Sequence, residues 1–110
     1  MIEESSFDTG KAIICFQYVE RIKSELIIAV KLLEKLNELN DDELAGGEKM
    51  MLSFLDALAG EITIAHGVLG LRNFGEARDK ILDAAGKILS QDYLGATNNI
   101  SKAISSVATS

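Results

Sequence analysis

Few side chains in this 110-residue chain could carry out chemistry. The only histidine is His66 and the only cysteine is Cys15, so no imidazole-rich or thiolate-rich metal site can form within one chain. The remaining candidates are carboxylates, and one set has helical spacing: Glu76, Asp79 and Asp83. Residues three or four positions apart share one face of a helix. These acids could therefore bind a divalent cation such as magnesium together.

This acidic set resembles part of an enzyme motif. All-α nucleotide pyrophosphatases bind magnesium through Glu-x-x-Glu on one helix and Glu-x-x-Asp on another, and Glu76-Ala-Arg-Asp79 matches the second half. The first half is missing, so the resemblance implies a magnesium-dependent nucleotide hydrolase whose acidic site is assembled between subunits. The acids lie opposite the apolar residues of the same helix, however. That position favours a solvated face on which they pair with Lys80 and Lys87.

Other catalytic motifs are absent from the sequence, which has no C-x-x-C, phosphate-binding loop, H-E-x-x-H or Glu-x-x-His. His66 is expected at the edge of an apolar helix face with its ring reaching solvent, and Cys15 is expected among core residues. A Cys15–His66 dyad would lack a group to orient the imidazole. We therefore expect no catalytic residue and no cofactor, and a non-enzymatic role is favoured.

The composition is typical of one all-α domain spanning residues 1–110. Hydrophobic residues make up 47% of the chain and proline is absent. The net charge is -6, and no basic stripe is present, which disfavours binding to nucleic acid.

The sequence also favours a cytoplasmic location. A single cysteine suits a reducing compartment, and the acidic N-terminus is unlike a signal peptide. The most apolar window contains Asp56, Glu61 and His66, whose burial in lipid would be costly. We expect no membrane-spanning segment.

The first helix is predicted from Asp8 or Thr9 to about Leu39, with residues 1–8 frayed. Its apolar residues follow a heptad pattern. They are Ala12, Cys15, Val19, Ile22, Leu26, Ala29, Leu33 and Leu36. Ile14, Tyr18, Ile28 and Leu32 widen the apolar surface beyond this stripe. We therefore expect this helix to be buried on more than one side.

The second helix is predicted to start at Glu43 or Glu48, after a break whose Asp41 or Asp42 could cap it, and to end at Leu69. It carries two stripes. The apolar stripe is Met51, Leu55, Leu58, Ile62, Ala65 and Leu69. The opposite stripe, at heptad spacing, is Gly46, Ser53, Gly60 and Gly67, flanked by Ile64 and Leu71. Glycine inside a helix costs about 1 kcal/mol relative to alanine, so this stripe predicts either close approach of another chain or a kink.

The C-terminal third is predicted to be a short helical hairpin. Asn73 and Glu76 form a possible capping box before a helix over residues 74–89, and a second helix covers residues 93–108, with 108–110 frayed. The two helices repeat each other. The aligned pairs are Asn73/Asp92, Phe74/Tyr93, Ala77/Ala96, Ile81/Ile100, Ala84/Ala103 and Ile88/Val107. The pattern resembles helices of tetratricopeptide repeats and of some nucleotidyltransferase-partner bundles, but a tetratricopeptide array needs a period of about 34 residues.

These elements predict an antiparallel four-helix bundle in which a long hairpin packs with a short one. The short hairpin cannot cover the long one, so apolar surface would remain for a second copy. We expect a homo-oligomer, with a dimer favoured, or an adaptor or regulatory subunit that acts through protein contacts. The alternative is the magnesium-dependent hydrolase described above.

Overall fold

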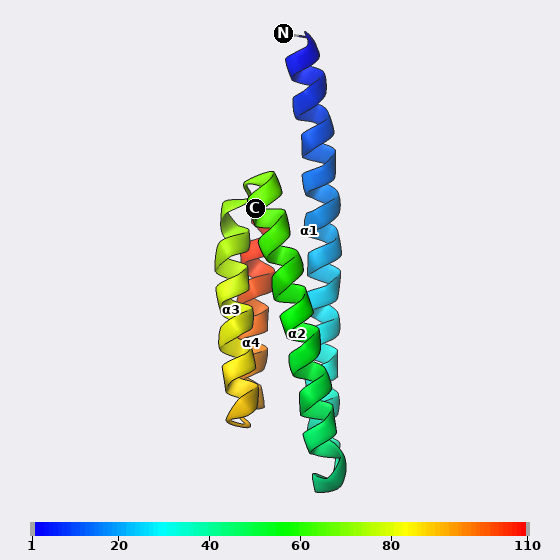
Figure 1. The fold of residues 1–110 in the computed structure, drawn as a ribbon, viewed down its shortest axis with the longest axis vertical. Coiled ribbons are helices and arrows are strands. Elements are labelled where there is room, and N and C mark those ends of the chain that lie inside the picture. The colour runs from blue at the N-terminus through cyan, green and yellow to red at the C-terminus, as the bar shows by residue number, and fades with distance from the viewer. Residues whose placement is uncertain (1, 110) are drawn as a thin grey trace.

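Four helices account for the fold, and they confirm the predicted all-α antiparallel bundle. The computed structural model describes the backbone of residues 2–109 and the side chains of residues 9–109. The helices are α1 (Ile2–Leu36), α2 (Asp41–Leu69), α3 (Arg72–Leu89) and α4 (Tyr93–Ala108), and no strand occurs within residues 2–109. Each helix packs against the helices before and after it in the chain, and α4 returns to α1, so the four form a ring (Figure 1).

The two hairpins differ in length, as predicted. Helices α1 and α2 have 35 and 29 residues, whereas α3 and α4 have 18 and 16. Figure 1 shows the N-terminal end of α1 projecting past every other helix, while the α1–α2 turn extends beyond the short hairpin at the opposite end. The result is a rod of 61 × 18 × 17 Å. Helix α2 runs without interruption through Gly60 and Gly67, so no break in α2 removes the mismatch.

The core is formed by the predicted apolar stripes. All six predicted residues of α2 are buried, and Ala59 joins them. In α1 only the last five predicted positions are buried: Ile22, Leu26, Ala29, Leu33 and Leu36. Ala12 is exposed and Cys15 and Val19 are half-buried, because this part of α1 reaches the end of the bundle, where it projects past the other helices.

The repeated residues of α3 and α4 face each other across the short hairpin. On α3 these are Phe74, Ala77, Ile81, Ala84 and Ile88, and on α4 they are Ala96, Ile100, Ala103 and Val107. All nine are fully buried. Because alternate positions are alanine, the two helices can pack closely along their whole length.

The helix ends differ from the prediction at several points. Helix α1 begins at Ile2 rather than at Asp8 or Thr9, and it ends at Leu36 rather than Leu39. No proline or glycine lies between Ile2 and Asp8 to interrupt the helical backbone. The predicted fraying of Met1 and Ser110 falls outside the described residues.

Asn40, rather than Asp41 or Asp42, caps helix α2. Its Oδ1 accepts a hydrogen bond of 3.0 Å from the Glu43 amide, and the Glu43 carboxylate accepts one from the Asn40 amide at 3.3 Å. This pair forms a capping box, so the acids of the turn occupy the first turn of the helix, where the dipole favours them.

The predicted cap at Asn73 is wrong. Gly70 ends α2 in the left-handed conformation, with φ 66°, and only Leu71 separates it from α3, so the helix has already begun at Arg72. Asn73 therefore lies inside the first turn. Its Nδ2 donates instead to Thr109 Oγ1 at 3.0 Å, which joins the start of α3 to the end of α4.

Tyr93 connects the short hairpin to the long one. Its hydroxyl donates a hydrogen bond of 2.7 Å to Glu48 Oε2 on α2. Burial and this bond to Glu48 raise the pKa of Tyr93 from 10.0 to about 12. The unfolded chain loses this proton near pH 10, so the stabilisation is complete below about pH 10 and is lost as the pH rises to about 12.

We expect the Tyr93→Phe variant to be less stable than the wild type by about 1 kcal/mol at pH 8, because one hydrogen bond is lost. The difference should shrink as the pH rises from about 10 to about 12, because both chains then lack the protonated hydroxyl. Urea unfolding of the two proteins across this range measures it. A difference that stays constant up to pH 12 would contradict the assigned role of the hydroxyl.

Candidate docking surface

The acidic set on α3 lies at the surface. Glu76, Asp79 and Asp83 are all exposed or half-buried at the helix exterior, and Asp79 forms an ion pair of 3.4 Å with its neighbour Arg78. Within residues 9–109 there is no cluster of three or more histidine, cysteine or acidic side chains that could hold a metal ion. The three acids therefore form an outer face of α3. Among the described side chains, no acid of another helix joins them to form a metal site.

His66 is part of the turn between α2 and α3. Its Nδ1 lies 2.8 Å from the carbonyl oxygen of Leu71, and the ring packs beside Gly75 in the first turn of α3. Because a carbonyl only accepts, Nδ1 must carry the hydrogen. His66 is half-buried at the edge of the apolar face of α2, as predicted, and this contact holds one edge of its ring against the turn. Cys15 is a half-buried thiol on α1 that shares no hydrogen bond with the histidine among the described side chains.

The small-residue stripe of α2 lies on the outside of the chain. Ser53, Gly60, Ile64 and Gly67 are exposed, and Gly46 is exposed near the start of α2. A Cβ atom built on any of the three glycines would meet no atom within 4 Å. Nothing in the described part of this chain therefore offsets the cost of about 1 kcal/mol that each glycine carries inside a helix.

Leu71, the last residue of the predicted interface set, has a different place. It precedes α3 as its N-terminal cap residue and is half-buried against the core. Its carbonyl also accepts the His66 hydrogen bond. Leu71 therefore belongs to the turn, and the open stripe ends at Gly67.

Large apolar side chains lie beside the open stripe. Met50 and Val68 of α2 are 76% and 74% exposed, and Ile28 and Leu32 of α1 are about half exposed. We call this surface the hairpin outer face. It consists of Ile28 and Leu32 on α1 and of Gly46, Met50, Ser53, Gly60, Ile64, Gly67 and Val68 on α2. The sequence predicted the part of this face on α1, because Ile28 and Leu32 widen the apolar surface of that helix. It did not predict Met50 and Val68, because they lie outside both predicted stripes of α2.

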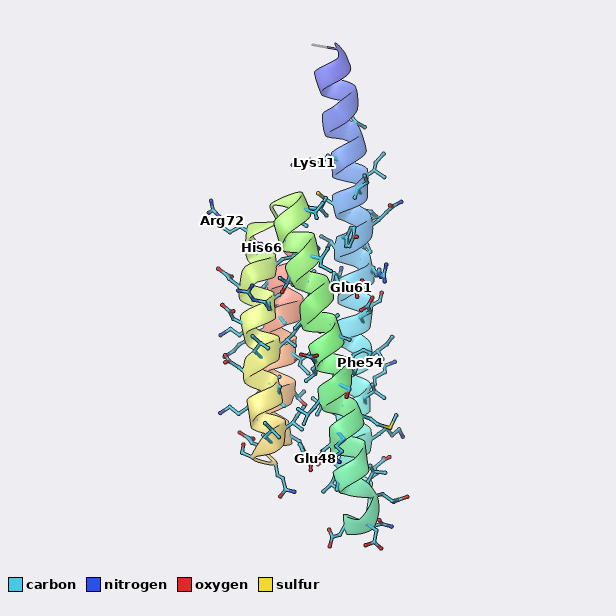
Figure 2. All side chains as sticks on the ribbon, in the orientation of Figure 1. Lys11, Glu48, Phe54, Glu61, His66 and Arg72 are labelled. Carbon is cyan, nitrogen blue, oxygen red and sulfur yellow. The ribbon has the colours of Figure 1, made fainter. Side chains whose placement is uncertain are left out.

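A cavity of about 290 Å³ opens at one end of the hairpin outer face, beside the α1–α2 turn. Leu32 and Met50 line it together with Phe54, which is labelled in Figure 2, and Lys35 is the charged residue among its described lining. Gly47 lets the two helices approach here, because a Cβ atom at this position would lie 2.7 Å from Leu39 Cδ1. The cavity gives the apolar face a hollow in which a side chain of a partner could be buried.

A charged cluster interrupts the apolar surface of the hairpin at its middle. Arg21 Nε lies 2.8 Å from Glu61 Oε1 and 3.1 Å from Glu25 Oε1. Arg21 of α1 therefore forms ion pairs with Glu25 of the same helix and with Glu61 of α2. The Arg21 side chain is 66% exposed, whereas those of Glu25 and Glu61 are 25% and 24% exposed. Figure 2 shows Glu61 in the C-terminal half of α2, on the side that faces α1.

Burial and the neighbouring Glu25 raise the pKa of Glu61, while Arg21 lowers it. The Glu61 Oε1 atom is closed off from solvent and has no hydrogen-bond donor among the described residues, so its contact with Arg21 is an ion pair only. The i, i+4 spacing of Arg21 and Glu25 was visible in the sequence. Its combination with Glu61 was missed, because that contact depends on how α1 and α2 are rotated against each other.

Helix α2 is the one described helix that is long and apolar enough to cross a membrane by length and composition alone. Core helices of soluble proteins and signal sequences have the same features, and α2 contributes one side of its helix to the core of this chain. Only 33% of its apolar window is buried in the chain, so the other three helices leave most of this window uncovered.

Comparison with known proteins adds no further constraint. No family model, curated protein or solved structure matches this chain. The function must therefore be inferred from the geometry of the chain itself.

Proposed function

We propose that this protein acts through contact with another protein chain, that the hairpin outer face is the contact surface, and that the simplest assembly is a homodimer in the cytoplasm. One observation carries the proposal. Three glycines stand on the outside of one long helix, and apart from chain neighbours and the backbone of the same helix, no atom of the described chain lies within 4 Å of where their Cβ atoms would be. A helix that approaches closely would give these glycines a packing role that the single chain does not provide.

The apolar side chains around the glycines support the same proposal. Met50, Ile64 and Val68 are each more than half exposed on the same helix. Exposed apolar side chains gathered on one side of a helix mark protein contact sites. The proposed chemistry is therefore burial of aliphatic surface, with no bond made or broken.

The test is the molar mass of the protein by light scattering. We expect the wild type to have twice the chain mass of 11.9 kDa. The double variant Gly60→Leu with Gly67→Leu should have the mass of one chain, because two bulky side chains would hold a neighbouring helix away. Circular dichroism should show that the variant remains helical, because both positions face solvent in the single chain.

The matched control is Gly86→Leu. Gly86 is also a helical glycine with no atom within 4 Å of its Cβ position, but it lies on α3. This variant should keep the wild-type mass. The proposal fails if the wild type is a monomer at all concentrations, or if the Gly60/Gly67 variant keeps the wild-type mass.

A further inference from the structure

We propose that the occupant of the hairpin outer face is a second copy of this chain, docked about a two-fold axis beside Gly60, so that Arg21 of each copy pairs with Glu25 and Glu61 of the other. The inference rests on the proposed function, because it names the partner and the geometry at the same surface. It also goes beyond that function, because it predicts specific ion pairs across the interface.

The charges of this surface are complementary to themselves. The cluster offers a cation with most of its side chain exposed, beside two acids. The residues named as the hairpin outer face are uncharged, and the exposed Lys49 and Asp56 lie among them on the same side of α2. In a two-fold interface, residue i of one copy meets residue j of the other and the reverse also holds. An axis that passes beside the cluster therefore places each Arg21 next to the acids of the second copy.

Glu61 is the group that most needs such a partner. Its Oε1 is closed off from solvent without a hydrogen-bond donor among the described residues, although Arg21 Nε lies 2.8 Å away. A guanidinium carries five N–H donors, and the contacts of Arg21 with Glu25 and with Glu61 both involve its Nε. The Arg21 of a second copy could present its Nη donors to this carboxylate, which a dimer would bury more deeply.

The backbone of α2 permits this approach. Gly60 directly precedes Glu61, and Ser53 and Gly67 lie at equal distances before and after Gly60 along the helix. A two-fold axis perpendicular to α2 at Gly60 makes the two copies of the helix antiparallel. It places Gly60 opposite Gly60 and Ser53 opposite Gly67. Side-chain size sets the distance between packed helices, so this arrangement permits close contact.

The available area is sufficient for a stable dimer. A standard interface removes about 800 Å² from each partner, which is about one-eighth of the 6834 Å² surface of this chain. One long side of a rod of 61 × 18 × 17 Å can supply this area. The cavity near Met50 lies along the same side and would be covered by the far end of the second copy.

The decisive experiment uses two charge reversals, Arg21→Glu and Glu61→Arg. Each variant alone should have the mass of one chain, because like charges would meet across the axis. An equimolar mixture should regain the dimer mass. In the mixed pair the glutamate introduced at position 21 of one copy faces the arginine introduced at position 61 of the other. The unchanged Glu61 of the first copy then faces the unchanged Arg21 of the second, so this pair also has opposite charges. The control is Arg78→Glu, which reverses a charge in the ion pair on α3 and should leave the wild-type dimer intact.

A cysteine cross-link tests the axis without altering the charges. In a Cys15→Ser background, Gly60→Cys should form a disulfide-linked dimer under mild oxidation, because the axis places position 60 beside itself. Gly86→Cys in the same background should not. The inference is overturned if the Gly60 variant cross-links no faster than the Gly86 variant, or if the mixed charge variants stay monomeric. The two proposals can fail separately. If the wild type is a dimer and the Gly60/Gly67 double leucine variant is a monomer, the proposed function holds. If in that case position 60 does not cross-link and the mixed charge variants stay monomeric, only this arrangement is rejected.

Discussion

Replacing Phe74 with alanine is expected to lower the free energy of unfolding by about 3–5 kcal/mol. Phe74 is 0% exposed and lies in the first turn of α3, where it belongs to the single buried core. Truncation would remove its contacts and leave a cavity, because the surrounding helices relax only partly. Small domains have a total stability of about 5–15 kcal/mol, so this one change would remove a large share of it.

Urea unfolding followed by circular dichroism measures the effect of Phe74→Ala. The matched control is Phe16→Ala on α1, whose aromatic ring is 63% exposed and which should stay within about 0.5 kcal/mol of the wild type. Equal losses in the two variants would mean that the start of α3 is not part of the core. A larger loss at Phe16 would mean that the projecting end of α1 is covered in solution.

Periodicity predicted the core of α2, α3 and α4 because α3 and α4 each have one buried side along the helix, and the predicted stripe of α2 begins at Met51, where its burial begins. A heptad stripe such as Leu55, Leu58 and Ile62 is buried wherever a helix packs continuously against its neighbours. The same logic overestimated α1. Whether Ala12 and Val19 are buried depends on how far the other helices extend beside them, and a periodic pattern does not contain that information.

The helix ends were harder to predict because several caps compete at each turn. Asn73 has the side chain of a good cap and Glu76 stands at the right position, but α3 begins at Arg72, so Asn73 already lies inside the helix. Asn40 caps α2 because it is the last residue before the acids of the first turn. In both turns, tertiary geometry decided between caps that were equally plausible by residue type.

The candidate surface could be predicted in part. The spacing of Gly46, Gly60 and Gly67 identified the open side of α2, because three glycines at heptad spacing share one helix face. The Arg21–Glu61 contact joins two helices, so it requires knowledge of their relative rotation and register. The sequence contains both residues but no local signal that pairs them.

Replacing Ala84 with leucine is expected to destabilise the bundle by about 1–3 kcal/mol, by overfilling rather than by leaving a void. Ala84 of α3 and Ala103 of α4 are both fully buried, at equivalent positions of the repeated pattern. The larger side chain at this point would push the helices of the short hairpin apart. Thermal unfolding measures the loss, and near-ultraviolet circular dichroism of Tyr93 would report the displacement of α4.

Ala85, the residue after Ala84, provides a control in which leucine should not lower the stability. Ala85 is half-buried and lines a cavity of about 260 Å³ between α2 and α3, beside Leu52 and Leu82. Leucine at position 85 has space to occupy, so Ala85→Leu should leave the stability unchanged or raise it by burying more apolar surface. If both leucine variants are destabilised equally, the close packing assigned to α3 and α4 is wrong. If only Ala84→Leu is destabilised, the alanines at the repeated positions set the distance between the two helices.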